Sequence, residues 1–423
     1  KMRENSRKIY VYENWSRDIP VKMGTLYADG NRGKEVYSFE YDNEWLKNRD
    51  AIITFDPDLG LYNGRQYVPM DKQIFGIFAD SCPDRWGRLL MKRREAIIAR
   101  KEERRPKALN ELDFLLGVYD EARMGAIRFK NSEDGEFLSC DKELATPPWT
   151  TLRTLESASI EFEKDESGIN EKWLKQLLAP GSSLGGARPK ATVQAPDSSL
   201  WIAKFPSKHD DVDSGAWEMT VHDLAELYGL NVPLAKAEQF SRNGTTFLVK
   251  RFDRNGKKRL HFSSSMTLLG QTDGASATNG ISYLDIASFI RANGSQPQAD
   301  LIELWKRIVF NIAVANTDDH LRNHGFILDD YGWRLSPLYD VNPNIYGDCL
   351  SLNITDEDAS LNFNLALETA EFYGISEKKA IEEIDKVKKI VVNNWERLAS
   401  KYQLSRSAIE YMRPAFDMKF KEC

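Results

Sequence analysis

The feature that most constrains the fold of this chain is a change of pattern near residue 254. Before it, short alternating apolar runs predict β-strands, as in KIYVYEN, KMGTLYAD and EVYSFEYD. After it, apolar residues recur at helical spacing, most clearly in ADLIELWKRIVFNIAVAN at 299–316. The sequence therefore predicts an α+β protein with a β-rich first half and a helical second half.

The expected domain organisation follows from the length of the chain and from the positions of its turn-rich stretch and its change of pattern. A chain of 423 residues exceeds what one hydrophobic core usually serves. A turn-rich stretch at 131–150 is the best candidate for a linker, and the pattern change near 254 marks a second boundary. We therefore expect a small β subdomain at 1–130, a β-rich lobe at 131–253 and an all-α lobe at 254–423.

Composition narrows the class of protein. The net charge is −6 and the pI about 5.7, so no global basic footprint for nucleic acid is present. The basic helix expected at 88–105 also carries three glutamates, which favours a solvated face with internal ion pairs over DNA contact. No apolar run approaches the roughly 18 residues that span a bilayer. The cysteines are too scattered for a disulfide framework, and we expect a cytoplasmic protein without membrane contact; they are Cys82, Cys140, Cys349 and Cys423.

The stretch NTDDHLRNHGF at 316–326 crowds acids, histidines and asparagines together, which suggests chemistry. One hypothesis is a zinc site, because His320 and His324 are four residues apart. Zinc proteases with this spacing carry a glutamate after the first histidine, whereas this chain has Leu321. No other histidine sits in a ligand-like cluster. Two ordinary loop histidines with hydrogen bonds are therefore the better interpretation, and Asp319 is expected to be a solvated neighbour.

A second hypothesis rests on Asp318 and Asn323, which have the spacing D-x-x-x-x-N. Protein kinases use this spacing because the Asp orients the attacking hydroxyl and the Asn holds Mg²⁺. A second metal-binding acid is required downstream across a short hairpin, and Asp340 follows the strands expected at 325–328 and 333–335.

The order of upstream motifs supports the kinase hypothesis. A glycine-bearing stretch, SSLGGARPK, precedes a hairpin whose second strand carries Lys204. Glu218 lies near the start of the helix expected at 215–229, and FLVKRFD follows as a hinge candidate. Each part alone has an ordinary structural explanation: a tight turn, a surface lysine, or a first-turn glutamate favoured by the helix dipole. Their joint occurrence in the functional order favours phosphoryl transfer.

These segments resemble a known family. GSSLGGARPK, WIAKFP, WEMTVHDLAELYGLNVP, VKRFDR, NTDDHLRNHGF and LSPLYDVNP together resemble the HipA family of serine/threonine kinases, the toxins of bacterial toxin–antitoxin modules. The similarity runs from about residue 10 to residue 415 and is most specific between 181 and 345. It implies a two-lobed protein-kinase-like fold with an extra small β subdomain.

The resemblance also implies roles for individual residues. Asp318 would be the catalytic acid/base, Asn323 and Asp340 the Mg²⁺ ligands, and His320 a residue that shapes the loop. Lys204, supported by Glu218, would contact the ATP phosphates. The other implied nucleotide contacts are Gly185, Gly186, Ala187 and Lys190 in the phosphate loop and Val249, Lys250, Arg251 and Phe252 around the adenine.

The resemblance further implies self-inhibition. The serine of the family's S-x-x-G-A-x-x-K loop corresponds to Ser183, with Ser182 beside it. Family members autophosphorylate this serine, which ejects the loop and inactivates the kinase. A phosphate of about −2 charge in that place would repel the phosphates of ATP.

Partners and alternatives complete the expectations. The family implies ATP and Mg²⁺ as cofactors and an aminoacyl-tRNA synthetase, often the glutamyl enzyme, as substrate. A HipB-like helix-turn-helix antitoxin would be the partner, with DNA contacted only through it. Two alternatives remain: a small-molecule phosphotransferase of the aminoglycoside type, which shares the D-x-x-x-x-N arrangement, and a non-catalytic module that binds antitoxin and acts as a co-repressor.

Overall fold

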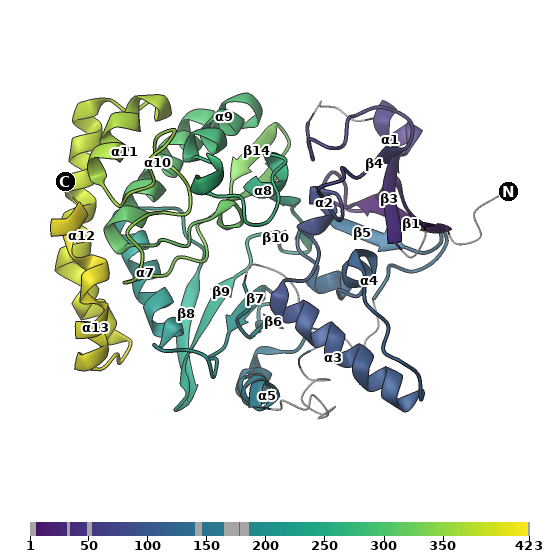
Figure 1. The fold of residues 1–423 in the computed structure, drawn as a ribbon, viewed down its shortest axis with the longest axis horizontal. Helices are drawn as coiled ribbons and strands as arrows, with labels where there is room; N and C mark the ends of the chain where they lie inside the picture. Colours follow the sequence, from purple (N-terminus) through teal and green to yellow (C-terminus); the bar gives the residue numbers. More distant parts are fainter. Residues whose placement is uncertain are drawn as a thin grey trace. The chain divides into compact units, whose positions relative to one another are not determined.

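The computed structural model describes residues 6–31, 34–48, 53–139, 146–164, 177 and 186–421. The chain divides into two compact units, each built from two stretches of sequence. Unit 1 comprises Lys1–Ala203 with Asp253–Thr272, and unit 2 comprises Lys204–Phe252 with Asp273–Cys423. Figure 1 shows their helices and strands. The three-part division expected from the sequence stays a prediction.

A five-stranded antiparallel sheet is the centre of the first part of unit 1 (Figure 1). Its first strand forms because buried and exposed positions alternate: Ile9 and Val11 are buried, while Tyr10 and Tyr12, each next along the chain, stay partly exposed. The strands predicted in KIYVYEN, KMGTLYAD and EVYSFEYD are therefore confirmed. In spatial order the strands are β4 (Gln66–Tyr67), β3 (Lys34–Tyr41), β2 (Val21–Asn31), β1 (Ser6–Glu13) and β5 (Ile127–Lys130).

The remaining elements of unit 1 are helices and short hairpins. The basic helix expected at 88–105 is present as α3 (Arg85–Lys101), and the Asp84 side chain caps it by accepting from the Gly87 amide at 2.8 Å. The other helices are α1 (Asn43–Lys47), α2 (Gly76–Ala79), α4 (Glu111–Leu116), α5 (Leu152–Lys164) and α8 (Ser265–Leu268). The strands are β6 (Lys190–Gln194), β7 (Leu200–Lys204, ending on the first residue of unit 2), β10 (Arg254–Asn255), β11 (Lys258–Arg259) and β12 (Phe262–Ser264).

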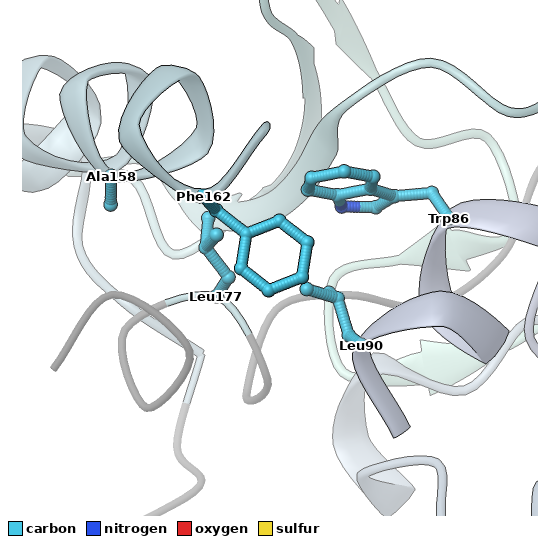
Figure 2. Packing of buried hydrophobic residues seen from close by; sticks show 5 residues of the cluster. All are labelled: Trp86, Leu90, Ala158, Phe162 and Leu177. Carbon is cyan, nitrogen blue, oxygen red and sulfur yellow. The ribbon is translucent and has the colours of Figure 1, made fainter. Parts of the chain in front are cut away.

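A hydrophobic cluster joins α3 to α5 (Figure 2). The rings of Trp86 and Phe162 meet edge to face with centroids 5.4 Å apart, and the Trp86 indole donates to the Lys190 carbonyl at 3.2 Å. The start of β6 is therefore held against α3. The members of the cluster are Trp86, Leu90, Ala158, Phe162 and Leu177.

Unit 2 is mainly helical and is organised around α10 (Pro297–Val314). Every residue from Arg307 to Val314 is buried, as expected for a stretch that is apolar on all sides apart from Arg307 and Asn311. α9, α11, α12 and α13 pack against it (Figure 1). The predicted helices of this half are confirmed as α9 (Tyr283–Asn293), α10, α11 (Phe363–Thr369), α12 (Glu377–Lys401) and α13 (Arg406–Phe416).

Unit 2 also contains two antiparallel strand pairs and a helix packed on one of them. The pairs are β8 (Ala235–Ser241) with β9 (Gly244–Lys250), and β13 (Gly325–Asp329) with β14 (Gly332–Leu335). The helix is α7 (Ser214–Tyr228), as predicted. Among the described residues, no helix is both long and apolar enough to cross a bilayer.

The N-terminus of α7 is fastened to β9. The Asp213 carboxylate caps the helix through the Ala216 amide at 3.1 Å. It also accepts from the Thr245 amide at 3.0 Å and from the Thr245 hydroxyl at 2.9 Å. A Cβ at Gly215 would lie 2.0 Å from the Thr245 carbonyl oxygen, so the helix approaches the strand at a distance that only glycine permits.

Candidate active site

Three predicted residues meet in unit 2 around a buried lysine. The Lys204 Nζ lies 2.5 Å from the Glu218 carboxylate and 2.8 Å from that of Asp340. Burial alone would lower the pKa of Lys204, but the charges of Asp340 and Glu218 outweigh it and raise the pKa above its ordinary value. The lysine therefore remains a cation at any physiological pH, held between a carboxylate of α7 and one that follows β14.

Asp340 itself has an unusual backbone. Its φ of 58° lies in the left-handed region, which non-glycine residues seldom adopt except as Asn or Asp. The residue before it, Tyr339, donates its hydroxyl to the Arg322 carbonyl at 2.6 Å. Its ring lies 5.6 Å from that of Phe252. The segment that carries Asp340 is thus held against the loop at 316–324 and against the end of the hinge candidate.

The loop begins where α10 ends, two residues earlier than the helix expected from the sequence. Ala315 caps the helix with φ 52° and ψ 47°. The chain then passes through exposed Asp318 and a short 3₁₀ turn, η5 (Leu321–Asn323), before entering β13. The left-handed residue turns the chain sharply, which brings Asp318 and Asn323 into one compact loop.

The Asn323 side chain is oriented by this loop in a way that suits a cation. Its amide nitrogen donates to the Asp318 carbonyl oxygen at 2.9 Å. Its Oδ1 is buried and, among the residues that the structure describes, has no hydrogen-bond partner. A buried carbonyl oxygen without a donor is costly unless a ligand occupies it, and Mg²⁺ prefers oxygen ligands. Asn323 Oδ1 and the Asp340 carboxylate fit such an ion.

Asp319 corrects the expectation of a solvated neighbour. Its side chain is 1% exposed, and its Oδ2 accepts three hydrogen bonds. The donors are the Tyr283 hydroxyl at 2.6 Å, the Asn311 amide at 2.7 Å and the His324 Nε2 at 2.7 Å. Burial alone would raise the pKa of Asp319, but His324 and the Tyr283 hydrogen bond outweigh it and lower the pKa below its usual value. Asp319 is a buried anchor of the loop.

A signal for this anchor exists in the sequence. Asn311 lies inside an otherwise apolar helical run, VFNIAVAN, and a polar residue there must find a buried partner. The adjacent aspartates point to opposite sides of the turn, so one can reach solvent while the other reaches Asn311. Spacing alone could not distinguish the two.

The two histidines do not form a metal site with their neighbours. His324 is fully buried and hydrogen-bonded to Asp319, so its interpretation as a hydrogen-bonded loop residue is confirmed. The His320 carbonyl accepts from the backbone N–H of Asn323 at 2.9 Å, so the backbone of His320 takes part in the turn. Within the described ranges, no group of three His, Cys, Asp or Glu side chains could hold a metal ion.

The remaining predicted nucleotide contacts are found in both units. In unit 2, Val249 lies in the buried part of β9, and Arg251 after the strand is also buried. In unit 1, Lys190 forms a buried 2.7 Å ion pair with Asp84, and Gly186 has a φ of 92°. Lys250 and Phe252 are partly buried in unit 2, and Ala187 is exposed in unit 1. Ser182, Ser183 and Gly185 lie outside the described residues.

The sequence is similar to known proteins in this same region. Residues 182–395, just over half of the chain, match the family model of the HipA-like C-terminal domain. The chain is 33% identical to Y4mE of Sinorhizobium fredii over 149 residues, which is 33% of each protein. It is 25% identical over 286 residues to the serine/threonine-protein kinase toxin HipA of Shewanella oneidensis, covering 59% of this chain and 64% of that protein. The matched regions thus span between one third and just under two thirds of these relatives.

A solved structure extends the likeness to the whole fold. A chain from the complex of Shewanella oneidensis HipA, HipB and operator DNA matches with a TM-score of 0.66 at 18% identity, over 96% of both chains. At that identity the likeness shows the fold, and the expected HipA-type, protein-kinase-like α+β architecture is confirmed. The family model and the fold agree, and the chain belongs to the HipA family.

Proposed function

We propose that this chain is a serine/threonine protein kinase that transfers the γ-phosphoryl group of ATP to a protein hydroxyl. The observation that carries the proposal is the placement of Lys204 between Glu218 and Asp340. In kinases a strand lysine paired with a helix glutamate binds the phosphates, and a nearby aspartate holds Mg²⁺. The 2.5 Å and 2.8 Å pairs reproduce that arrangement from three separate segments of the chain.

Each residue then has one task. ATP·Mg²⁺, when bound, supplies the phosphoryl group and the divalent charge that offsets the phosphates. Lys204 would donate to phosphate oxygens while Glu218 fixes its direction, and the oxygens of Asn323 and Asp340 would hold the metal. Asp318 is exposed, so its carboxylate can accept the proton of a hydroxyl presented by a second macromolecule.

The resemblance to the family extends the proposed nucleotide site beyond these residues. The adenine would contact the segment at 249–252. The loop that contains Gly185, Gly186, Ala187 and Lys190 would serve the phosphates. Lys190 would act as the anchor of that loop, because its ammonium is already paired with Asp84.

The biological role is proposed from the relatives. The Shewanella relative is named a kinase toxin, and the matching structure contains HipB and operator DNA. We infer a cytoplasmic toxin whose partner is a HipB-like antitoxin, with DNA contacted only through that antitoxin. Its substrate would be an aminoacyl-tRNA synthetase, and phosphorylation of Ser183, or of Ser182 beside it, would switch it off.

Incubation of the purified chain with radiolabelled ATP tests the proposal. Wild type should label itself at 181–190, and the Asp318→Asn variant should not. Equal label in both would show that the catalytic assignment is wrong. Label that moves only to small hydroxyl compounds would indicate a small-molecule phosphotransferase. A melting temperature that Mg²⁺ and ATP leave unchanged would indicate a non-catalytic co-repressor.

A further inference from the structure

A chain of buried hydrogen bonds joins the two segments that carry the proposed metal ligands. The backbone N–H of Asn342, two residues after Asp340, donates to the Asn316 side-chain Oδ1 at 3.1 Å. The Asn316 Nδ2 donates to the Asn311 Oδ1 at 3.0 Å, and the Asn311 Nδ2 donates to the Asp319 Oδ2 at 2.7 Å. We call Asn311, Asn316 and Asp319 the amide relay. It runs from beside Asp340 to beside Asp318.

A second, shorter connection runs parallel to the relay. The backbone N–H of Asn344 donates to the Ala315 carbonyl at 3.0 Å. The Asn344 side chain donates to the Thr317 hydroxyl at 2.7 Å. The segment at 342–344 is therefore fastened to the segment at 315–317 by three hydrogen bonds, all within four residues of Asp340 and three residues of Asp318.

The relay is buried and fully directional. Asn311 is 0% exposed and Asn316 is 1% exposed. Each amide donates through its nitrogen and accepts through its oxygen, so neither can turn over without breaking both of its bonds. A network in which every member is satisfied in one orientation specifies one geometry. An apolar contact at the same place would tolerate sliding.

The backbone on both sides of the relay needs such support. Ala315 and Asp340 both adopt left-handed φ values, 52° and 58°. Non-glycine residues hold that conformation only where surrounding contacts enforce it. The hydrogen bonds from Asn342 and Asn344 reach the chain at Ala315 and at the two residues after it. These hydrogen bonds therefore restrain the backbone next to both left-handed residues, Ala315 and Asp340.

We propose that Asn316 is a positioning residue: through the amide relay it holds the Asp340 carboxylate at a fixed separation from the Asn323 carbonyl oxygen, so that one Mg²⁺ binds both. The proposal rests on the proposed kinase function, because a metal must be shared by these two residues. Asn316 touches neither ligand side chain in the reaction. It acts through the backbone of the 342–344 segment.

The test compares Mg²⁺ dependence in wild type and Asn316→Ala, using the full chain. Binding of the non-hydrolysable ATP analogue AMP-PNP is measured by calorimetry at increasing Mg²⁺. Loss of outer partners typically weakens metal affinity 10–100-fold. We expect the Mg²⁺ concentration for half-maximal enhancement of binding to rise by about tenfold or more. Binding of the analogue without Mg²⁺ should stay within about twofold of wild type, because Lys204 and Glu218 are untouched.

Thr369→Val is the matched control. Thr369 is buried in unit 2, and its hydroxyl bonds only to carbonyls of its own helix, α11. The control removes a buried hydrogen bond without touching the relay, so its Mg²⁺ dependence should match wild type. If Asn316→Ala does not fold, Asn316→Asp decides, because it keeps the acceptor for the backbone amide of Asn342 but removes the donor to Asn311 Oδ1. We then expect a smaller rise in the required Mg²⁺, about threefold, scaled from the same loss of outer partners.

The outcomes separate the two proposals. A raised Mg²⁺ requirement in either Asn316 variant, with the Thr369 control unchanged, supports positioning. A variant that melts earlier but keeps the wild-type Mg²⁺ dependence overturns it and leaves the kinase function standing. A wild type that binds AMP-PNP equally with and without Mg²⁺ overturns both, since no metal is then shared.

Discussion

Lys204 and Asp340 form a 2.8 Å ion pair although 136 residues separate them in the sequence. The second partner of the lysine, Glu218, is more deeply buried: its side chain is 7% exposed, against 26% for Asp340. The two carboxylates are therefore not equivalent. In the proposed kinase, Asp340 would be the carboxylate that a cation reaches, and Glu218 the one that stays paired with Lys204.

Replacing Lys204 by methionine should harm both stability and nucleotide binding. The buried Glu218 carboxylate loses its cation, and leaving a buried charge unpaired costs about 3–5 kcal/mol. The double variant Lys204→Met with Glu218→Gln should recover part of that free energy of unfolding but none of the nucleotide affinity. Urea unfolding and AMP-PNP titration measure the two effects. Equal stability of the single and double variants would contradict the pairing seen here.

Asp318→Asn should leave the free energy of unfolding almost unchanged and strongly reduce the rate of phosphoryl transfer. The side chain is exposed, so the free energy of unfolding should change by no more than about 0.5 kcal/mol. Loss of the proton acceptor should slow phosphoryl transfer by about 10²–10⁴-fold. Asp330→Asn, exposed in the turn between β13 and β14, is the control and should transfer phosphate at the wild-type rate. An Asp318→Asn variant with full activity would remove this residue from the mechanism.

Asp319→Ala should differ from Asp318→Asn in that it strongly reduces the free energy of unfolding. Three buried donors, from Tyr283, Asn311 and His324, lose their common acceptor. Each unsatisfied buried group costs about 1–3 kcal/mol, so we expect a loss of at least 3 kcal/mol in unfolding experiments. A loss below about 1 kcal/mol would show that water replaces the carboxylate and that the loop is not anchored here.

His261 should make unit 1 sensitive to acid. It is buried and stacks on Trp15 with ring centroids 4.5 Å apart, and burial lowers its pKa to about 3. Between pH 3 and the ordinary value of 6.5 the unfolded chain binds a proton that the folded chain does not. Stability therefore rises with pH across that window and gains nothing further from this group above it.

The variant His261→Phe keeps an aromatic ring on Trp15 and removes the titration. Its loss of stability between pH 6.5 and pH 4 should be smaller than that of wild type, by an amount on the order of a few kcal/mol. Urea unfolding at fixed pH values measures it. His209→Gln, at an exposed position, serves as the comparison. Identical acid profiles for wild type and His261→Phe would show that another group sets the sensitivity.

Much of the fold was predictable because its elements carry local signals. Alternation marks β1, and uninterrupted apolar spacing marks α10. The association of Lys204, Glu218 and Asp340 could be expected from the order of their motifs, since each motif lies on an element of the expected type. Order along the chain, however, carries no distances, and only the folded chain shows that one lysine serves both carboxylates.

The loop at 316–324 was less predictable for a physical reason. Its course depends on Ala315 adopting a left-handed conformation, which alanine disfavours and which no sequence pattern signals. That single residue ends α10 early and sends Asp319 inward while Asp318 faces solvent. The roles of Asn311 and Asn316 depend on the same turn. The sequence signals that Asn311 needs a buried partner, but which partner it has is evident only in three dimensions.

The close approach of Gly215 to β9 has a consequence for the regulation of the proposed kinase. The start of α7 lies directly against the backbone of β9 at Thr245, with no room for a side chain between them. Glu218, three residues further along α7, therefore reaches Lys204 from a helix end that is held by a backbone contact. In the proposed kinase the Lys204–Glu218 pair is thus part of the fixed framework, and we expect regulation to act on another part of the chain.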